Sequence, residues 1–277
     1  FAKRRAYAAI APLVGISAGA PVELAAGMRI RADEPGELAG HWPEAAGLLP
    51  PRWGREPDML LVLEWECPLD AVEAEPPDAP AELADAVTAV RLATGGPVAA
   101  GPVLFERLDW RPFGIRPLLP VAAARPAGEP VRLDVVRGRV ARDLLARLWG
   151  VDADRGLDEA VERWELSLFQ AAGHRDDSLR EALGGALGGG DGPFAAVLRA
   201  ALLLGDSGNE RREVLHQLRG LAKGAEAGPA AVDSVRGALV EVLLHGDRAA
   251  LIESLDDSLL GLQPRPSVAA SARAAAG

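Results

Sequence analysis

The chain has 277 residues, 49% of them hydrophobic, and carries 30 Lys and Arg against 40 Asp and Glu, a formal net charge of −10. This length predicts one large domain or two ordinary ones, and the acidic balance argues against a general polyanion binder. The apolar runs are too short to span a bilayer, and the single cysteine, Cys67, excludes an internal disulfide framework and an all-cysteine zinc site. We therefore expect a cytoplasmic protein with no membrane segment and no cofactor.

The composition also limits what local patterns mean. Only two of the 30 basic residues are lysines, Lys3 and Lys223, as expected for a GC-rich genome, so arginine clusters alone are weak evidence of function. The chain begins at Phe1 rather than Met, and we expect the natural chain to extend upstream. Residues 3–20 are basic and then Ala-rich, like a signal peptide, but Pro12 and Gly15 interrupt the apolar stretch. A buried first element is the favoured interpretation.

Proline divides the chain, because 18 of the 22 prolines lie in residues 1–130. Proline is excluded from helix interiors and central strands, so this part should consist of strands, turns and loops. The patterns predict one clear strand at 59–67, weaker strands at 22–31 and 103–110, and loops at 68–80 and 112–130. One helix should begin near Pro80 and end at Gly95 and Gly96.

The second part has helical periodicity throughout. We expect helices at 131–149, 158–171, 178–187, 193–204, 209–221, 233–245 and 247–262. Three of them have candidate N-caps, which are Ser178, Asp233 and Asp247. The predicted fold class is α+β, with a strand-rich domain at 1–130, a helical bundle at 131–262 and a disordered tail at 263–277.

Two glycine-containing motifs suggest chemistry. Gly15 to Gly19 match G-x-S-x-G and, followed by Ala20, resemble the nucleophile elbow of patatin-like lipid hydrolases, with Ser17 as nucleophile and Asp191 before Gly192 as its partner. The elbow needs a preceding strand and an oxyanion loop, and only 14 residues precede Gly15. The glycine-rich stretch 184–192 lacks the lysine of a phosphate-binding loop, so we interpret it as a linker.

Other polar and aromatic candidates favour structural roles. His41, His174, His216 and His245 are scattered without metal-ligand spacing, so no metal site is expected. Glu64 and Glu66 share a strand face and suit a metal or paired-carboxylate site, although a solvated face is the favoured interpretation. The tryptophans of the first part are expected to fill the core: Trp42, Trp53, Trp65 and Trp110.

Arg211 and His216 form the candidate catalytic pair. They stand about 140° apart on a helix and flank one side of it. An arginine can hold a phosphate and a histidine can move a proton, so the pair suits RNA cleavage by the adjacent 2′-hydroxyl. An Arg-rich helix face with an incidental histidine is the alternative. Arg236 and His245 lie on opposite faces of their helix and need a partner chain to meet.

The helical part resembles the HEPN superfamily, particularly its Apea-like bacterial branch, over segments 157–165, 198–205, 211–219 and 250–261. Residues 89–96 resemble a segment often placed ahead of such bundles. The resemblance implies a helical bundle, commonly dimeric, of a kind found in antiphage defence. Many members are metal-independent ribonucleases with an Arg-x(4–6)-His motif. Others only bind RNA, nucleotides or proteins.

The family's Arg-Ser…His-Gly signature is replaced here by residues 221–228. We therefore expect a catalytically degenerate scaffold of bacterial defence or RNA metabolism that binds RNA, a nucleotide or a protein. If it is active, Arg211 grips the scissile phosphate and His216 acts in acid–base chemistry across a homodimer. The net charge of −7 over residues 151–277 weighs against RNA binding. The alternatives are a protein-interaction module, with the N-terminal domain binding the partner, and the Ser17 hydrolase.

Overall fold

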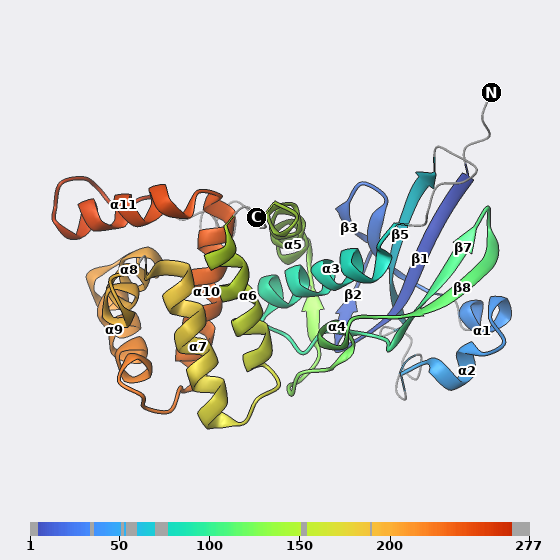
Figure 1. The fold of residues 1–277 in the computed structure, drawn as a ribbon, viewed down its shortest axis with the longest axis horizontal. Coiled ribbons are helices and arrows are strands. Elements are labelled where there is room, and N and C mark those ends of the chain that lie inside the picture. The colour runs from blue at the N-terminus through green and yellow to red at the C-terminus, as the bar shows by residue number, and fades with distance from the viewer. Residues whose placement is uncertain are drawn as a thin grey trace. The chain divides into compact units, whose positions relative to one another are not determined.

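The computed structural model describes residues 5–33, 36–50, 53, 60–69, 77–150, 154–188 and 190–267. They form two compact units, Phe1–Leu145, here called the sheet unit, and Ala146–Gly277, the helical unit. Figure 1 shows strands in the first and helices in the second, which confirms the α+β class with the strands in the N-terminal part. In the described part of the chain, no helix has both the length and the apolarity to cross a membrane.

The main sheet is built on β1 (Arg5–Val14), which lies at its centre. The strand order is β3 (Val22–Ala25), β4 (Met28–Ala32), β5 (Leu61–Leu69), β1, β7 (Val103–Leu108) and β8 (Arg111–Pro117), with the short β6 (Ala99–Ala100) also on β1. Residues 7–13 of β1 are all buried, as a strand covered on both faces requires. The Ala-rich stretch is thus a core strand, and the preference for a buried first element is confirmed.

Pro12 lies in this central strand without breaking it. Its carbonyl accepts a hydrogen bond from the Gly101 amide at 2.7 Å, on the side away from β5. The N–H and C=O of a residue in an antiparallel strand point to the same neighbour, so the ladder between β1 and β5 loses no donor.

Two predictions for residues 1–130 were wrong. The expected strand at 22–31 is the hairpin of β3 and β4, turning at Gly27, whose φ is +74°. The expected loop at 112–130 contains β8, paired with β7, and the short helix α4 (Pro120–Ala123). Two prolines, Pro112 and Pro117, hid this strand, but β8 is at the sheet edge, where proline is tolerated.

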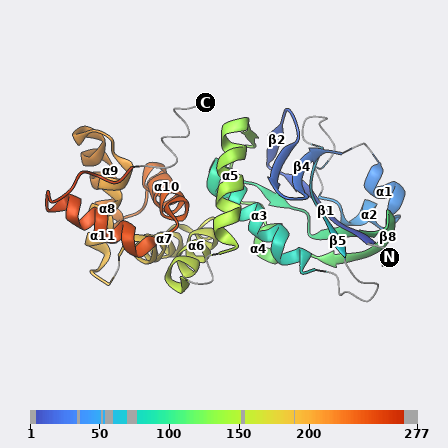
Figure 2. The same cartoon turned by 90° about the horizontal axis from the view of Figure 1, so that it is seen from above.

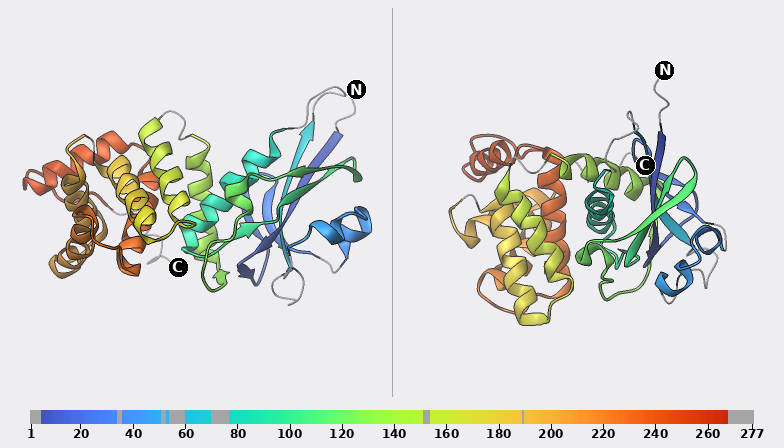
Figure 3. Two further views of the ribbon diagram at one scale, coloured as in Figure 1. Left: turned by 60° about the horizontal axis from the view of Figure 1, so that its bottom comes forward. Right: turned by 45° about the vertical axis from the view of Figure 1, so that its right-hand side comes forward.

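Helices cover both faces of the sheet (Figure 3). On one face lies α3 (Ala79–Thr94), with Pro80 in its first turn and Gly95 ending it at a φ of +66°, as predicted. On the other lie α1 (Glu37–His41) and α2 (Ala45–Leu48). Residues of these helices, and Trp42 between them, pack on residues of β1, β5 and β7 in one cluster, formed by Leu38, Trp42, Ala45, Ile10, Val62 and Phe105.

The sheet unit extends further than the expected boundary after residue 130. Residues 131–149, predicted as one helix, are β9 (Val131–Leu133), a turn, and α5 (Val135–Leu148). β9 pairs in parallel with β2 (Ile16–Ala18), and on α5 the Arg142 guanidinium donates to the Glu23 carbonyl at 3.0 Å. These contacts place residues 131–145 in the sheet unit.

One helix of the helical unit contacts all the others, and Figure 2 shows this unit from above. Its helices are α6 (Arg155–Ser167), α7 (Ala172–Leu187), α8 (Pro193–Leu204), α9 (Gly208–Ala222), α10 (Pro229–His245) and α11 (Arg248–Leu259). α10 contacts each of the helices α6 to α9 and also α11, and its residues 238–244 are all buried. A helix that is buried on all sides is expected to be apolar along its whole sequence. Residues 238–244 fit this expectation except at Glu241.

Of the three expected caps, only Asp247 was correct, since its side chain accepts from the Ala250 amide. Ser178 lies inside α7 and donates to Gln170, while Asp233 lies inside α10 and binds Arg236. Both helices start earlier than expected, α7 at Ala172 and α10 at Pro229. Proline suits the first turn of α10. The expected disordered tail is held down at its start by Arg265, which pairs with Asp206, and residues 268–277 lie outside the described part.

Gly15 provides a test of this fold. Its φ is +78°, and a Cβ there would lie 2.1 Å from the Pro97 carbonyl oxygen. Gly15→Ala should lower the free energy of unfolding by about 1–3 kcal/mol through backbone strain, and further through the clash. Urea unfolding measures this.

Gly36→Ala is the matched control, because Gly36 has a φ of +87° and no atom within 4 Å of the added Cβ. Equal losses in the two variants would contradict the close approach of Gly15 to Pro97.

Candidate functional site

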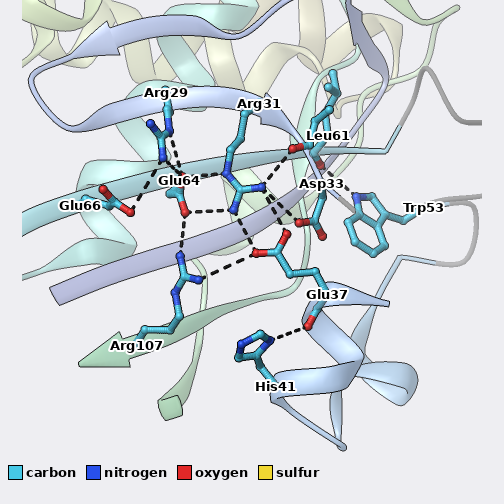
Figure 4. Close-up of polar contacts among 11 residues, drawn as sticks. Arg29, Arg31, Asp33, Glu37, His41, Trp53, Leu61, Glu64, Glu66 and Arg107 are labelled. Atoms are coloured by element: carbon cyan, nitrogen blue, oxygen red, sulfur yellow. Dashed lines mark hydrogen bonds and ion pairs between the residues drawn. The ribbon is translucent and has the colours of Figure 1, made fainter. Parts of the chain in front are cut away.

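A buried carboxylate organises one face of the sheet (Figure 4). The Glu64 side chain on β5 is 1% exposed and accepts hydrogen bonds from three arginines. Arg29 Nη2 and Arg31 Nε lie 2.7 Å from its Oε2, and Arg107 Nη2 lies 2.8 Å from its Oε1. We call these four residues, with Asp33 and Glu37, the Glu64 cluster.

Strand register places the cluster on one face. Arg29 of β4 and Ile10 of β1 lie directly opposite Glu64, and residues two apart on a strand share a face. Arg31 therefore joins from β4, and Arg107 joins from β7 because it lies two residues beyond Phe105, the partner of Ile10. α1 adds Glu37, whose carboxylate lies 3.3 Å from Arg31.

The favoured interpretation of Glu64 as part of a solvated face was therefore wrong, because α1 and the neighbouring arginines cover it. The metal alternative has no support in the described part either, where no three His, Cys, Asp or Glu side chains are grouped to hold an ion. Burial by itself raises the pKa of Glu64, but hydrogen bonds from Arg31 and Arg29 outweigh it and hold the pKa below its ordinary value.

Asp33 behaves in the opposite way. Burial, and then the hydrogen bond and negative charge of Glu37, raise the pKa of Asp33 from 3.8 to about 7, against the effect of Arg31. The buried Oδ2 of Asp33 has no hydrogen-bond partner, and a buried oxygen without a partner disfavours the charged carboxylate. The cluster thus contains a proton that titrates near neutral pH.

Removing the Glu64 carboxylate should be costly. Glu64→Ala leaves three arginines facing one another on a covered sheet face, and uncompensated buried charge typically costs about 3–5 kcal/mol. The free energy of unfolding in urea measures this.

Glu66→Ala is the matched control two residues along the strand, where the side chain is 39% exposed and 3.9 Å from Arg29. It should cost less than about 1 kcal/mol. Comparable losses in both variants would mean that the arginines do not depend on Glu64.

Asp33 predicts a pH dependence of stability. The folded protein holds the Asp33 proton up to about pH 7, while the unfolded chain releases it near 3.8. Stability from this group is therefore complete below pH 4 and is lost as pH rises toward 7. Asp33→Asn should flatten the unfolding free energy measured between pH 4.5 and 8. Parallel curves for the parent and the variant would show that Asp33 ionises normally. The pKa of Glu64 lies below its ordinary value of 4.5, so titration of Glu64 does not affect stability within this pH range.

The structure does not join Arg211 and His216 beyond their spacing on α9. Arg211 is partly buried and its Nε donates to the Gly205 carbonyl at 2.9 Å, while His216 is exposed. Arg236 binds Asp233, and His245 Nδ1 lies 2.9 Å from the Asp247 carbonyl oxygen. Catalysis by Arg211 and His216 remains a prediction.

The geometry of a nucleophile elbow is absent from the described residues. Ser17 lies in the middle of β2, and the chain continues into β3 rather than a helix. Asp191 is bound by Arg199, which also donates to the carbonyls of Leu187 and Gly188. The glycine-rich stretch after α7 is thus a connection that directs carbonyls at an arginine, the opposite of a phosphate cradle.

Tryptophan burial was predicted correctly for Trp42, which is 4% exposed, and wrongly for Trp110, which is 69% exposed. Trp110 lies at the tip of the hairpin between β7 and β8, beyond the reach of the core. The alternation of buried and exposed side chains along a strand does not continue through a two-residue turn. The sequence pattern therefore could not predict whether Trp110 is buried.

Sequence reasoning missed a hollow of about 510 Å³ in the helical unit, where α6 and α11 begin. Its polar lining comes from three separate segments and includes Arg147, Asp154, Arg155, Asp247 and Arg248. Arg248 is bound to Asp154 at 2.6 and 2.8 Å, whereas Arg155 is 90% exposed and pairs with Glu159. In the described part of the chain, exposed Arg147 makes no hydrogen bond or ion pair. Only the fold brings these residues together.

Comparisons with known proteins do not assign this arrangement. No family model matches the chain, and neither a curated protein nor a solved structure matches it.

Proposed function

We propose that the protein is a non-catalytic RNA-binding scaffold whose helical unit is a HEPN-like bundle. The observation that carries the proposal is the hollow at the starts of α6 and α11, with Arg147 and Arg155 exposed at its rim. Arginine is the side chain best suited to phosphate, and the N-terminal end of a helix carries partial positive charge.

The side chains that line the hollow carry a net positive charge, which favours binding of an anion, although the chain as a whole is acidic. Arg147, Arg155 and Arg248 outnumber the two capping aspartates, Asp154 and Asp247. The caps already accept hydrogen bonds from the first turns of their helices, and Arg248 is occupied by Asp154. Phosphate contacts therefore fall to Arg147 and to the Nη groups of Arg155, whose Nε is bound to Glu159. Two such arginines support weak binding of a polyanion through two of its phosphates.

Two observations support a scaffold rather than a nuclease. The guanidinium of Arg211 is engaged by the Gly205 carbonyl, and exposed His216 shares no hydrogen bond with it. The hollow itself is lined by no histidine among the described residues, so it offers phosphate contacts without a general base that titrates near neutral pH. The sheet unit is then available for a second ligand or a protein partner.

RNA binding should depend on Arg147 and Arg155. We expect Arg147→Glu/Arg155→Glu to weaken binding of a single-stranded 12-mer at least tenfold in fluorescence anisotropy. Loss of two phosphate contacts should also reduce the slope of log K against log salt by about 1.4, at roughly 0.7 per phosphate.

The matched control is Arg163→Glu/Arg212→Glu, which reverses the same charge at two exposed arginines of the same unit. Equal weakening in both double variants would mean that net charge, not the hollow, governs binding. Failure of the folded parent to bind RNA would favour the protein-interaction alternative.

Cleavage is tested separately, with total tRNA in EDTA. We expect none from the parent. Cleavage that disappears in both Arg211→Ala and His216→Ala would overturn the scaffold proposal and establish a metal-independent ribonuclease.

A further inference from the structure

A second hollow, of about 290 Å³, lies beside the Glu64 cluster in the sheet unit. Its floor is formed by the small side chains of Ala6 and Ala8 on β1. The residues paired with them are longer. Pro68 and Glu66 of β5 form one wall, and Arg107 of β7 begins the other. Small residues on a central strand between longer neighbours leave a groove, here open beyond α1 and α2.

Trp110 completes the second wall and is held there at a conformational cost. Asp109 and Trp110 have φ values of +51° and +68°, the left-handed conformations that a two-residue hairpin turn of this type requires. Such positions favour glycine or asparagine, and a bulky residue is rare there. Asp109 fixes the turn, because its carboxylate accepts from Arg5 Nε at 3.2 Å and from the Ala6 amide at 3.0 Å. A strained, exposed tryptophan that adds nothing to the core points to a ligand.

The polar groups of the two walls are complementary in kind. On β5, the Glu66 carboxylate is 39% exposed and only accepts hydrogen bonds. Across the groove, the Arg107 side chain is 10% exposed, and its buried Nε donates to no partner. The Arg107 guanidinium lies 5.6 Å from the centre of the Trp110 ring. The hollow thus offers an acceptor on one side, the positive charge of a guanidinium on the other and an aromatic face.

We propose that this hollow binds a guanine base. Guanine presents N1–H and N2–H₂ donors, which suit Glu66, next to an O6 acceptor, which suits Arg107, and its ring can stack on Trp110. Adenine presents an N1 acceptor to the carboxylate in the same pose, and uracil flanks its single donor with two carbonyl oxygens. Both leave Glu66 facing an acceptor, so the site discriminates against them.

This proposal does not depend on the RNA-binding role of the helical unit, because every residue in it belongs to the sheet unit. The base can come from a free guanine nucleotide or from a guanine in single-stranded RNA. Base recognition is common to both sources, and guanosine without phosphate should bind as well as the monophosphate.

Isothermal titration of the full chain with guanosine, GMP and AMP tests the proposal. We expect AMP to bind at least tenfold more weakly than GMP. Trp110→Ala and Glu66→Gln should each weaken GMP at least tenfold, as loss of a stacking surface or a charge-assisted hydrogen bond does. Trp110→Phe should retain most of the affinity. Phe113→Ala, which removes an exposed aromatic of the same hairpin outside the hollow, should change nothing.

The RNA source is tested with a hexamer that contains one guanine, against the same hexamer with adenine in its place. Guanine-dependent binding of the hexamer that is lost in Trp110→Ala supports the site even where GMP alone is weak. Equal binding of GMP and AMP overturns the proposal, as does an absence of binding to GMP and hexamer by parent protein with native circular dichroism. Arg147→Glu/Arg155→Glu should bind GMP like the parent, so failure of one proposal leaves the other intact.

Discussion

Glu64 is a carboxylate buried on a sheet face, and taking such a charge out of water costs several kcal/mol unless other groups compensate it. Compensation comes from Arg29 and Arg31 of β4 and from Arg107 of β7, so one acid ties three strands together. A slip of one residue in either pairing would move an arginine to the opposite face and leave Glu64 unpaired. The cluster therefore fixes strand register more than it adds stability, since a well-packed apolar substitute is often as stable as a buried ion pair.

The same requirement accounts for the proton on Asp33. Three arginines are balanced by Glu64, Glu37 and, at the open end, Glu66, to which Arg29 is 3.9 Å away. Asp33 is a fourth carboxyl in a set that already has equal numbers of cations and anions. Its cation, Arg31 at 3.2 Å, is shared with Glu64 and Glu37, so burial and the neighbouring Glu37 raise the pKa of Asp33 to about 7. Glu66 and Arg107, at one end of this face, also line the groove beside Trp110.

Sequence patterns predicted the elements whose signals are local. Pro80 and Gly95 bounded α3, Asp247 capped α11, and the apolar run of residues 60–63 marked β5. Signals that depend on tertiary position were misread. Proline at 112 and 117 is excluded from a central strand but not from an edge, and the sequence does not say which strand is the edge. Likewise, alternation at Glu64 predicts a polar face, and only the register of β4 and β7 turns that face into a buried cluster. Arg147, Arg155 and Arg248 lie too far apart in sequence for any spacing rule to join them.

Arginine is abundant in this chain, so its presence alone means little, and what separates one arginine from another is whether the fold already occupies its donors. In the helical unit Arg199 binds Asp191, Asp256 and two carbonyls at the end of α7. Arg248 binds Asp154 and the Gly185 carbonyl, and Arg180 binds the Leu221 carbonyl. All three arginines donate to carbonyls at the end of α7 or α9, where the last turn of a helix leaves carbonyls without partners in the same helix. Arg147, in the last turn of α5, and Arg155, at the start of α6, satisfy no such carbonyl among the described residues, yet they line the same hollow. Their position, rather than their number, distinguishes the proposed phosphate-binding surface from the arginine-rich background, and it reconciles the proposed anion site with an acidic chain.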